Sequence, residues 1–299
     1  MSSRHLNSSL FSLLLTIVLL IPGLSAAEEI IKPYMLSSES PGSVAEKADQ
    51  AKVALAENGF TIVGSYSPYA GAVVIAVTND ELKKTAAESE FGGYGAVARV
   101  AVTKGENGVQ VSYFNPVWMA NAYRLSNDLT GVAAGLKKAL GAKEAFGSED
   151  GEDKEDLRDF HFMIMMPYFD DHNTLAEYDS YEEAVKAVEA GLAAKKGGTS
   201  KVYRVDVPGK EETLFGVAMT EDASGDKHIM DIIDFGQLKQ TANLPYEILV
   251  SGGNVYALHA KFRIAVNFPD LTMGTFTNIM DAPGAIEDAL AAAAGAEDY

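Results

Sequence analysis

The sequence predicts an α+β protein made of two tandem repeats, each with the order strand, helix, strand, strand, helix, strand, strand, helix. β-rich runs joined by short glycine-containing turns, such as residues 104–108, favour a mainly antiparallel or mixed sheet. Two helical patterns begin at capping boxes, SVAE at residues 43–46 and SYEE at residues 180–183, and similar elements follow both in the same order. This recurring order predicts an internal duplication.

The first repeat is assigned to residues 28–142. It begins with the strand-like run IIKPYML and continues with a helix over residues 44–55, where apolar side chains recur every three or four positions. The phrase ELKKTA at residues 81–86 predicts a short helix, and the last helix is expected over residues 119–142. The remaining strands are expected at residues 60–66, 72–78, 95–103 and 108–116.

The second repeat is assigned to residues 159–299. The apolar run FHFMIMMPYF at residues 160–169 predicts its first strand, and a helix follows the second capping box. QLKQTA at residues 237–242 is interpreted as the counterpart of ELKKTA, with the polar stretch 221–227 as an insertion before it. Further strands are expected at residues 200–207, 214–220, 246–252 and 255–269, and the last helix at residues 273–296.

Residues 143–158 separate the two repeats. This segment is acidic and polar and has no apolar period, so it is predicted to be a solvated linker. Its carboxylates do not follow the ligand spacing of a calcium-binding loop.

Residues 1–27 are expected to be a secretory signal peptide. Arg4 precedes an apolar run at residues 10–21, and the small residues Ser25 and Ala27 suit a cleavage site. The run is shorter than the roughly 20 residues that span a bilayer. The protein is therefore predicted to be periplasmic or secreted, with no membrane attachment after cleavage.

Composition narrows the possible functions. The 299 residues carry 42 acidic and 24 basic side chains, a formal net charge of −18. Such a surface repels phosphate backbones and anionic lipid, so neither nucleic acid nor a membrane is an expected partner. The chain has no cysteine, which excludes disulfides, thiol catalysis and cysteine-ligated iron–sulfur clusters.

The stretch VARVAVTKGENGVQVSYFNPVWMANAYRL, residues 97–125, resembles the family catalogued as domain of unknown function 302. A strand, a glycine-containing turn and a strand ending in Tyr-x-Asn-Pro carry the resemblance, which covers roughly residues 30–142. In the second repeat Ala265 is aligned with Tyr113, and Phe268 separates Asn267 from the following proline. The resemblance implies an α+β fold and no particular reaction.

Amphipathic aromatic residues beside a fixed amide suggest a small-molecule site at the end of the last hairpin of the first repeat. The alternative is that the amide shapes a turn and the only tryptophan closes the core. The candidate ligand-binding residues, with their assumed counterparts in both repeats, are Tyr34, Tyr113, Asn115, Trp118, Tyr168 and Asn267.

Residues 161–171 offer two other chemistries. On a strand, His161, Met163 and Met165 would share one face and offer copper the imidazole and thioether ligands that suit it, but methionine is also an ordinary core residue. The acid pair Asp170 and Asp171 would form an acid/base site only if burial or crowding moved one pKa, but it follows a strand end and is expected to be solvated loop. No phosphate loop, dinucleotide fingerprint or nucleophile elbow is present.

The sequence therefore favours an exported, soluble, non-catalytic protein that binds a small molecule or an envelope protein partner and needs no cofactor. The alternatives are an enzyme of unrecognised type with its site between the repeats, and periplasmic handling of copper or another metal. The repeats are expected to pack as an intramolecular pseudo-dimer, because a linker raises the effective concentration of two complementary surfaces.

Overall fold

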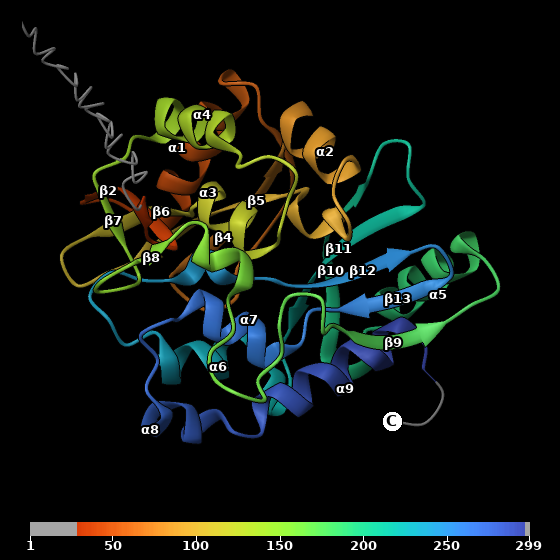
Figure 1. Ribbon diagram of the computed structural model, residues 1–299. Coiled ribbons are helices and arrows are strands. Elements are labelled where there is room, and N and C mark those ends of the chain that lie inside the picture. The colour runs from red at the N-terminus through yellow and green to blue at the C-terminus, as the bar shows by residue number, and fades with distance from the viewer. Residues whose placement is uncertain (1–28, 297–299) are drawn as a thin grey trace, which may run out of the picture.

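The computed structural model describes residues 29–296, so the predicted signal peptide, residues 1–27, lies outside the described part. The α+β class is confirmed: helices pack on two antiparallel sheets (Figure 1). The strand order is β3-β4-β5-β6-β2-β7 in the first sheet and β10-β11-β12-β13-β9 in the second. Within the described residues, no helix combines the length and hydrophobicity needed to cross a bilayer.

The first sheet and its helices form the first half of the molecule. Its strands are β2 (Tyr34–Ser40), β3 (Thr61–Tyr66), β4 (Ala72–Thr78), β5 (Ala98–Lys104), β6 (Val109–Phe114) and β7 (Glu144–Phe146). Its helices are α1 (Val44–Glu57), α2 (Asp80–Ala87), the 3-10 turn η1 (Gly92–Gly95), α3 (Pro116–Ala122) and α4 (Thr130–Leu140). Helix α1 begins where the capping box predicts, because the Ser43 hydroxyl accepts the Glu46 N–H at 3.2 Å.

The second sheet and its helices form the second half. Its strands are β9 (Asn173–Glu177), β10 (Thr199–Asp206), β11 (Glu212–Met219), β12 (Tyr246–Ser251) and β13 (Asn254–Ala257). Its helices are α5 (Tyr181–Ala193), α6 (Asp226–Ile233), α7 (Ala260–Asn267), α8 (Met273–Phe276) and α9 (Ala282–Ala294). The short 3-10 turns are η2 (Asp156–Asp159), η3 (Lys196–Gly198), η4 (Asp222–Ser224), η5 (Thr241–Asn243) and η6 (Thr277–Ile279).

The predicted strand at residues 160–169 does not form. The position beside β13 is taken instead by β9, and the apolar run before it is a loop in which Ile164 and Met165 are 84% and 95% exposed. A continuous apolar run has no alternation that would set one face toward a core, so its composition alone does not specify a strand. Met165 has a φ of 71°, a left-handed backbone conformation that interrupts an extended chain.

QLKQTA is not the structural counterpart of ELKKTA. ELKKTA lies in α2, between β4 and β5, whereas the corresponding place between β11 and β12 is filled by α6. QLKQTA follows α6 as a loop that leads into η5. Residues 221–227 are therefore not a plain insertion, since they include η4 and the start of α6, which buries Ile229, Met230 and Ile233.

Three further boundaries differ from the prediction. The segment 255–269 contains the short strand β13 and then α7. Residues 262–268 are buried whether apolar or polar, so the surrounding structure and not an exposed polar face decides that they form a helix. Asn267 consequently ends a helix and is not the counterpart of Asn115. The predicted helix over residues 119–142 is divided between α3 and α4, and its counterpart over residues 273–296 between α8, η6 and α9.

Residues 143–158 are not a solvated linker. Strand β7 extends the first sheet by pairing with β2, and the ring of Phe146 packs on the ring of Tyr34 with their centroids 5.4 Å apart. Strand β8 (Glu152–Asp153) pairs with β1 (Ile30–Ile31), and Leu157 is buried in η2. Backbone pairing and these two apolar anchors hold the acidic segment against the first half.

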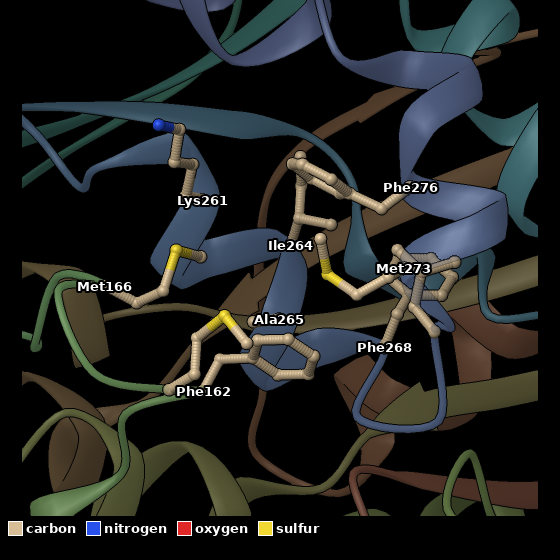
Figure 2. A pocket seen from close by; sticks show the side chains of 10 residues that line it. Phe162, Met166, Lys261, Ile264, Ala265, Phe268, Met273 and Phe276 are labelled. Atoms are coloured by element: carbon tan, nitrogen blue, oxygen red, sulfur yellow. The ribbon is translucent and has the colours of Figure 1, made fainter.

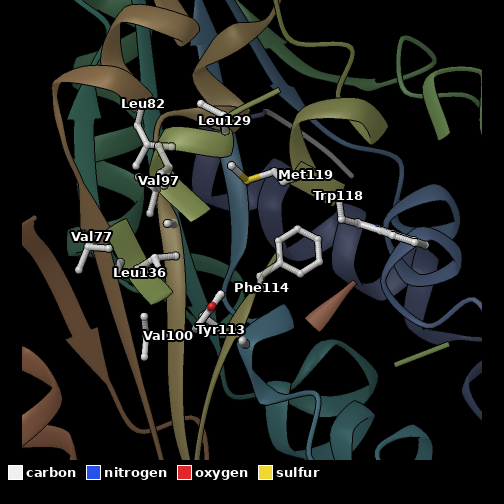
Figure 3. Packing of buried hydrophobic residues seen from close by; sticks show 14 of the residues in the cluster. Val77, Leu82, Val97, Val100, Tyr113, Phe114, Trp118, Met119, Leu129 and Leu136 are labelled. Carbon is white, nitrogen blue, oxygen red and sulfur yellow. The ribbon is translucent and has the colours of Figure 1, made fainter. Parts of the chain in front are cut away.

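The two halves share a core. The larger cluster of buried side chains includes Val100 and Phe114 of the first half (Figure 3) together with Leu249 and Phe262 of the second. The edge strands β3 and β10 also approach closely, since a Cβ on Gly64 would lie 2.3 Å from the Val202 carbonyl oxygen. Only glycine permits this approach, and the contact fixes one sheet edge against the other.

Candidate functional site

Three of the predicted ligand-binding residues meet at the contact between the halves. The Tyr34 hydroxyl donates to the carbonyl oxygen of Asn267 at 3.1 Å, and the Trp118 indole N–H donates to the carbonyl oxygen of Val266 at 3.1 Å. Both carbonyls belong to the last turn of α7, where a helix leaves its acceptors without partners. Tyr34, Trp118 and Asn267 are fully buried, so they anchor α7 to the first half.

The other three candidates lie apart. Tyr113 is buried in β6, and burial raises its pKa to about 12. Asn115 caps α3: its Oδ1 accepts the Val117 N–H at 3.1 Å, and its Nδ2 donates to the Lys32 carbonyl at 2.8 Å. Tyr168 is 38% exposed and stacks on His161 with ring centroids 4.6 Å apart. The six residues do not line the pocket or the depression described below.

The copper hypothesis loses its geometric basis. His161, Met163 and Met165 do not share a strand face, because no strand forms there and the Met165 side chain is almost fully exposed. Across residues 29–296, no three His, Asp or Glu side chains are grouped so as to hold a metal ion. Asp170 pairs with Arg124 at 3.0 Å, and Asp171 accepts the Tyr168 N–H at 3.0 Å, as expected of loop acids.

An apolar pocket lies between the 160–168 loop, α7 and α8 (Figure 2). Helix α7 contributes Lys261, Ile264 and Ala265, which lie on one helix face at i, i+3 and i+4, and its C-cap residue Phe268 follows them in the lining. The loop contributes Phe162, Met163 and Met166, and the segment after α7 contributes Leu271, Met273 and Phe276. The volume is about 100 Å³ and Lys261 is the only charged lining residue.

Exposed apolar side chains line this pocket and continue along the loop beside it. Met163 and Met273, which line it, are 47% and 51% exposed, and Ile164 and Met165 extend from the same loop into solvent. Contiguous apolar surface of this kind marks interaction sites on soluble proteins. Sequence reasoning missed the site because it assigned the methionine-rich run to a buried strand. A run without alternation, followed by Pro167, was the available signal that it is a surface loop.

An acidic depression adjoins the pocket. Its lining includes the carboxylates of Glu152, Asp156 and Asp159, and it shares Phe162 with the pocket. Asp156 and Asp159 lie three residues apart in the 3-10 turn η2, a spacing that places both side chains on one side. Burial raises the pKa of Glu152, and the nearby charges of Asp156, Asp150 and Asp270 act in the same direction.

A buried ionic network joins the halves at a second place. Arg99 of β5 contacts Glu247 of β12 at 3.2 Å, and the Tyr203 hydroxyl donates to the other Glu247 oxygen at 2.7 Å. Arg263 of α7 lies 3.9 Å from Glu247 and donates to the carbonyl of Asn243 at 2.6 Å. Arg99, Glu247 and Arg263 are almost fully buried. Because the network is enclosed by the shared core, it serves the contact between the halves.

Asp226 makes the stability of this contact depend on pH. Burial raises its pKa from 3.8 to about 7, while hydrogen bonds from the Tyr66 hydroxyl and the Met219 N–H and the charge of Arg263 act in the opposite direction. Between these two pH values the folded state binds more protons than the unfolded state. The free energy of unfolding contributed by this group therefore falls as the pH rises from about 4 to 7.

Asp226→Asn should remove that dependence. We expect the wild type to be more stable at pH 5 than at pH 8, with Asp226 contributing at most about 1.4 kcal/mol per pH unit. Urea unfolding at both pH values measures this for the variant and for Asp231→Asn, an exposed acid on the same helix that pairs with Lys227. The difference between the two pH values should shrink only in Asp226→Asn. An unchanged difference would contradict the assignment.

Neither a scan against protein-family models nor a search of curated proteins finds a match for this chain. The resemblance of residues 97–125 to domain of unknown function 302 therefore stays a prediction.

Proposed function

We propose that this chain is an exported, non-catalytic binding protein whose site is the apolar pocket between the 160–168 loop, α7 and α8. The observation that carries the proposal is the pocket itself, lined by methionine and phenylalanine and framed by exposed apolar side chains. Methionine is flexible and polarisable, so methionine-rich surfaces adapt to ligands of different shape. The proposal of export rests on residues 1–27, which have the composition of a signal peptide.

The dimensions of the pocket limit its ligand. Its volume of about 100 Å³ is smaller than the ~150 Å³ cavity that accommodates benzene in an engineered protein core. It therefore suits one apolar side chain or the end of an alkyl chain, and it is too small to enclose a large cofactor. Burying such a group would stabilise a complex by roughly 1.5–3 kcal/mol before the costs of association.

Xenon binding tests this site, because xenon is apolar, is smaller than benzene and enters dry apolar cavities. In methionine-methyl NMR spectra of the mature chain, xenon should shift the signals of Met163, Met166 and Met273 and leave the buried Met119 unchanged. Ala265→Phe, which places a ring in the pocket, should abolish these shifts. Ala54→Phe, the same change in a separate depression on α1, should preserve them. Shifts that are absent, or equally large at Met119, would refute the proposed site.

We also propose that the halves are duplicated units packed as an intramolecular pseudo-dimer. The order β3-β4-β5-β6-β2 corresponds strand by strand to β10-β11-β12-β13-β9, and α1 and α5 both begin at a serine cap after the equivalent strand. Helices α4 and α9 follow in the same place, with Leu136 and Leu290 buried in both. The shared core and the Arg99–Glu247 pair support close association of the two units.

A pseudo-dimer of this kind should unfold in one step. Trp118 is the only tryptophan and lies at the contact between the halves, so its fluorescence reports their separation, whereas circular dichroism reports both sheets. We expect the two signals to change at the same urea concentration. Two separate transitions by circular dichroism, with Trp118 following only one of them, would count against the proposal.

A further inference from the structure

We propose that the occupant of the apolar pocket is a cationic, amphipathic segment of another protein, which places an apolar side chain in the pocket and a lysine or arginine in the adjoining acidic depression. This inference rests on the proposed function, since it names the partner of the same site. It is carried by two features together: an apolar pocket and a carboxylate-lined depression that share Phe162.

The two features are close enough for one ligand. Phe162 lines both, and the consecutive residues Phe268 and Pro269 line the pocket and the depression respectively. A peptide presents side chains of different character on neighbouring positions, about 5–6 Å apart on one face of a helix. An apolar residue and a basic residue on the same helix face can therefore occupy the pocket and the depression at the same time.

The charge of the depression selects the partner. Among residues 29–296, Glu152, Asp156 and Asp159 form no ion pair within 4 Å, and the other titratable side chain that lines the depression is His161. A guanidinium or ammonium group would neutralise them and offset the desolvation of Glu152. The whole chain adds to this preference, with a formal net charge of −18.

The same charges disfavour lipid. An anionic bilayer would face a protein of like charge, and a fatty acid would find a single cation, Lys261, against the three acids of the adjoining depression. The exposed loop side chains Met163, Ile164 and Met165 instead offer an adaptable apolar surface around the anchor position. Amphipathic helices that dock in hydrophobic grooves use such surfaces.

Three synthetic peptides of equal length test the inference. The first is an amphipathic helix of leucine and lysine, the second replaces every lysine with glutamate, and the third scrambles the first so that it has no apolar face. Fluorescence anisotropy should show binding of the leucine–lysine peptide to the mature chain, with the other two at least about tenfold weaker. Bound peptide should shift the methyl signals of Met163, Met166 and Met273.

Charge variants locate the interaction. Asp156→Asn combined with Asp159→Asn should lower the affinity for the leucine–lysine peptide about tenfold, because two partly exposed ion pairs with the peptide are lost. The matched control is Glu46→Gln combined with Asp49→Asn, which removes the same charge from a depression on α1 and should have little effect. Equal weakening by both pairs would show that only the net charge matters and would overturn the inference.

Other outcomes separate this inference from the proposed function. If oleate or vesicles shift the pocket methionines while the leucine–lysine peptide does not, the pocket is a lipid site and the inference fails, whereas the binding function stands. If the scrambled and amphipathic peptides bind equally, the pocket takes no part and the inference also fails. If xenon and every peptide leave the methionine signals unchanged, both proposals fail.

Discussion

Replacing Glu247 with leucine should lower the free energy of unfolding by about 3–5 kcal/mol, because it leaves the charge of Arg99 buried without its partner. Arg99 is 1% exposed, so water cannot replace the lost carboxylate. Arg263, 3.9 Å from Glu247, loses a neighbouring negative charge as well. Urea unfolding at neutral pH, with unchanged slope against urea, measures the effect.

Two controls isolate the buried pair. Arg99→Met combined with Glu247→Leu removes both charges and should recover part of the loss, as replacement of buried ion pairs by apolar residues often does. Glu189→Gln removes an acid that pairs with Lys201 and Arg204 near the surface, and it should cost less than about 1 kcal/mol. If Glu247→Leu were as mild as Glu189→Gln, the network would not stabilise the contact between the halves.

Trp118→Ala should also destabilise the protein by about 3–5 kcal/mol, since it removes a large, fully buried side chain from the shared core. Trp118→Phe keeps much of the volume but leaves the Val266 carbonyl at the end of α7 without its donor, which should cost about 1–3 kcal/mol. Because the variants lack the only tryptophan, their unfolding is followed by circular dichroism.

The order of these losses distinguishes packing from hydrogen bonding. Tyr34→Phe serves as the matched control, because it removes the other donor to the end of α7 with almost no change in volume. Tyr34→Phe should lower the free energy of unfolding by about as much as Trp118→Phe does. A Trp118→Phe variant as stable as the wild type would show that the indole hydrogen bond contributes nothing.

Local signals in the sequence predicted local structure well. The caps at Ser43 and Ser180 begin α1 and α5, because the hydroxyl needs only an N–H three residues along the same chain. The hairpin predicted around residues 104–108 joins β5 and β6 in the antiparallel first sheet. These features depend on residues that are neighbours in the sequence.

Features that depend on distant residues were not predictable. ELKKTA and QLKQTA are nearly identical, yet the first lies in α2 and the second in a loop after α6. The candidate residues Tyr34 and Trp118 were expected to bind a ligand, but their polar atoms are occupied by the last carbonyls of α7. The pocket itself combines the 160–168 loop with a stripe on α7, which sequence reasoning had assigned to a strand.

The sequence by itself determined the α+β class, the antiparallel hairpins and the starts of α1 and α5, because propensity, capping and turn chemistry act within a few residues. Only the tertiary structure decided that residues 160–169 form a surface loop and that α7 is a helix. Residues 160–169 are apolar without a clear period, and residues 261–268 alternate apolar with polar or small side chains as a strand would, so the conformation of both segments follows from their neighbours. Strand β9 fills the sheet position beside β13, and the first half supplies the donors that end α7. The loop therefore lies beside α7 and α8, and together they line the apolar pocket.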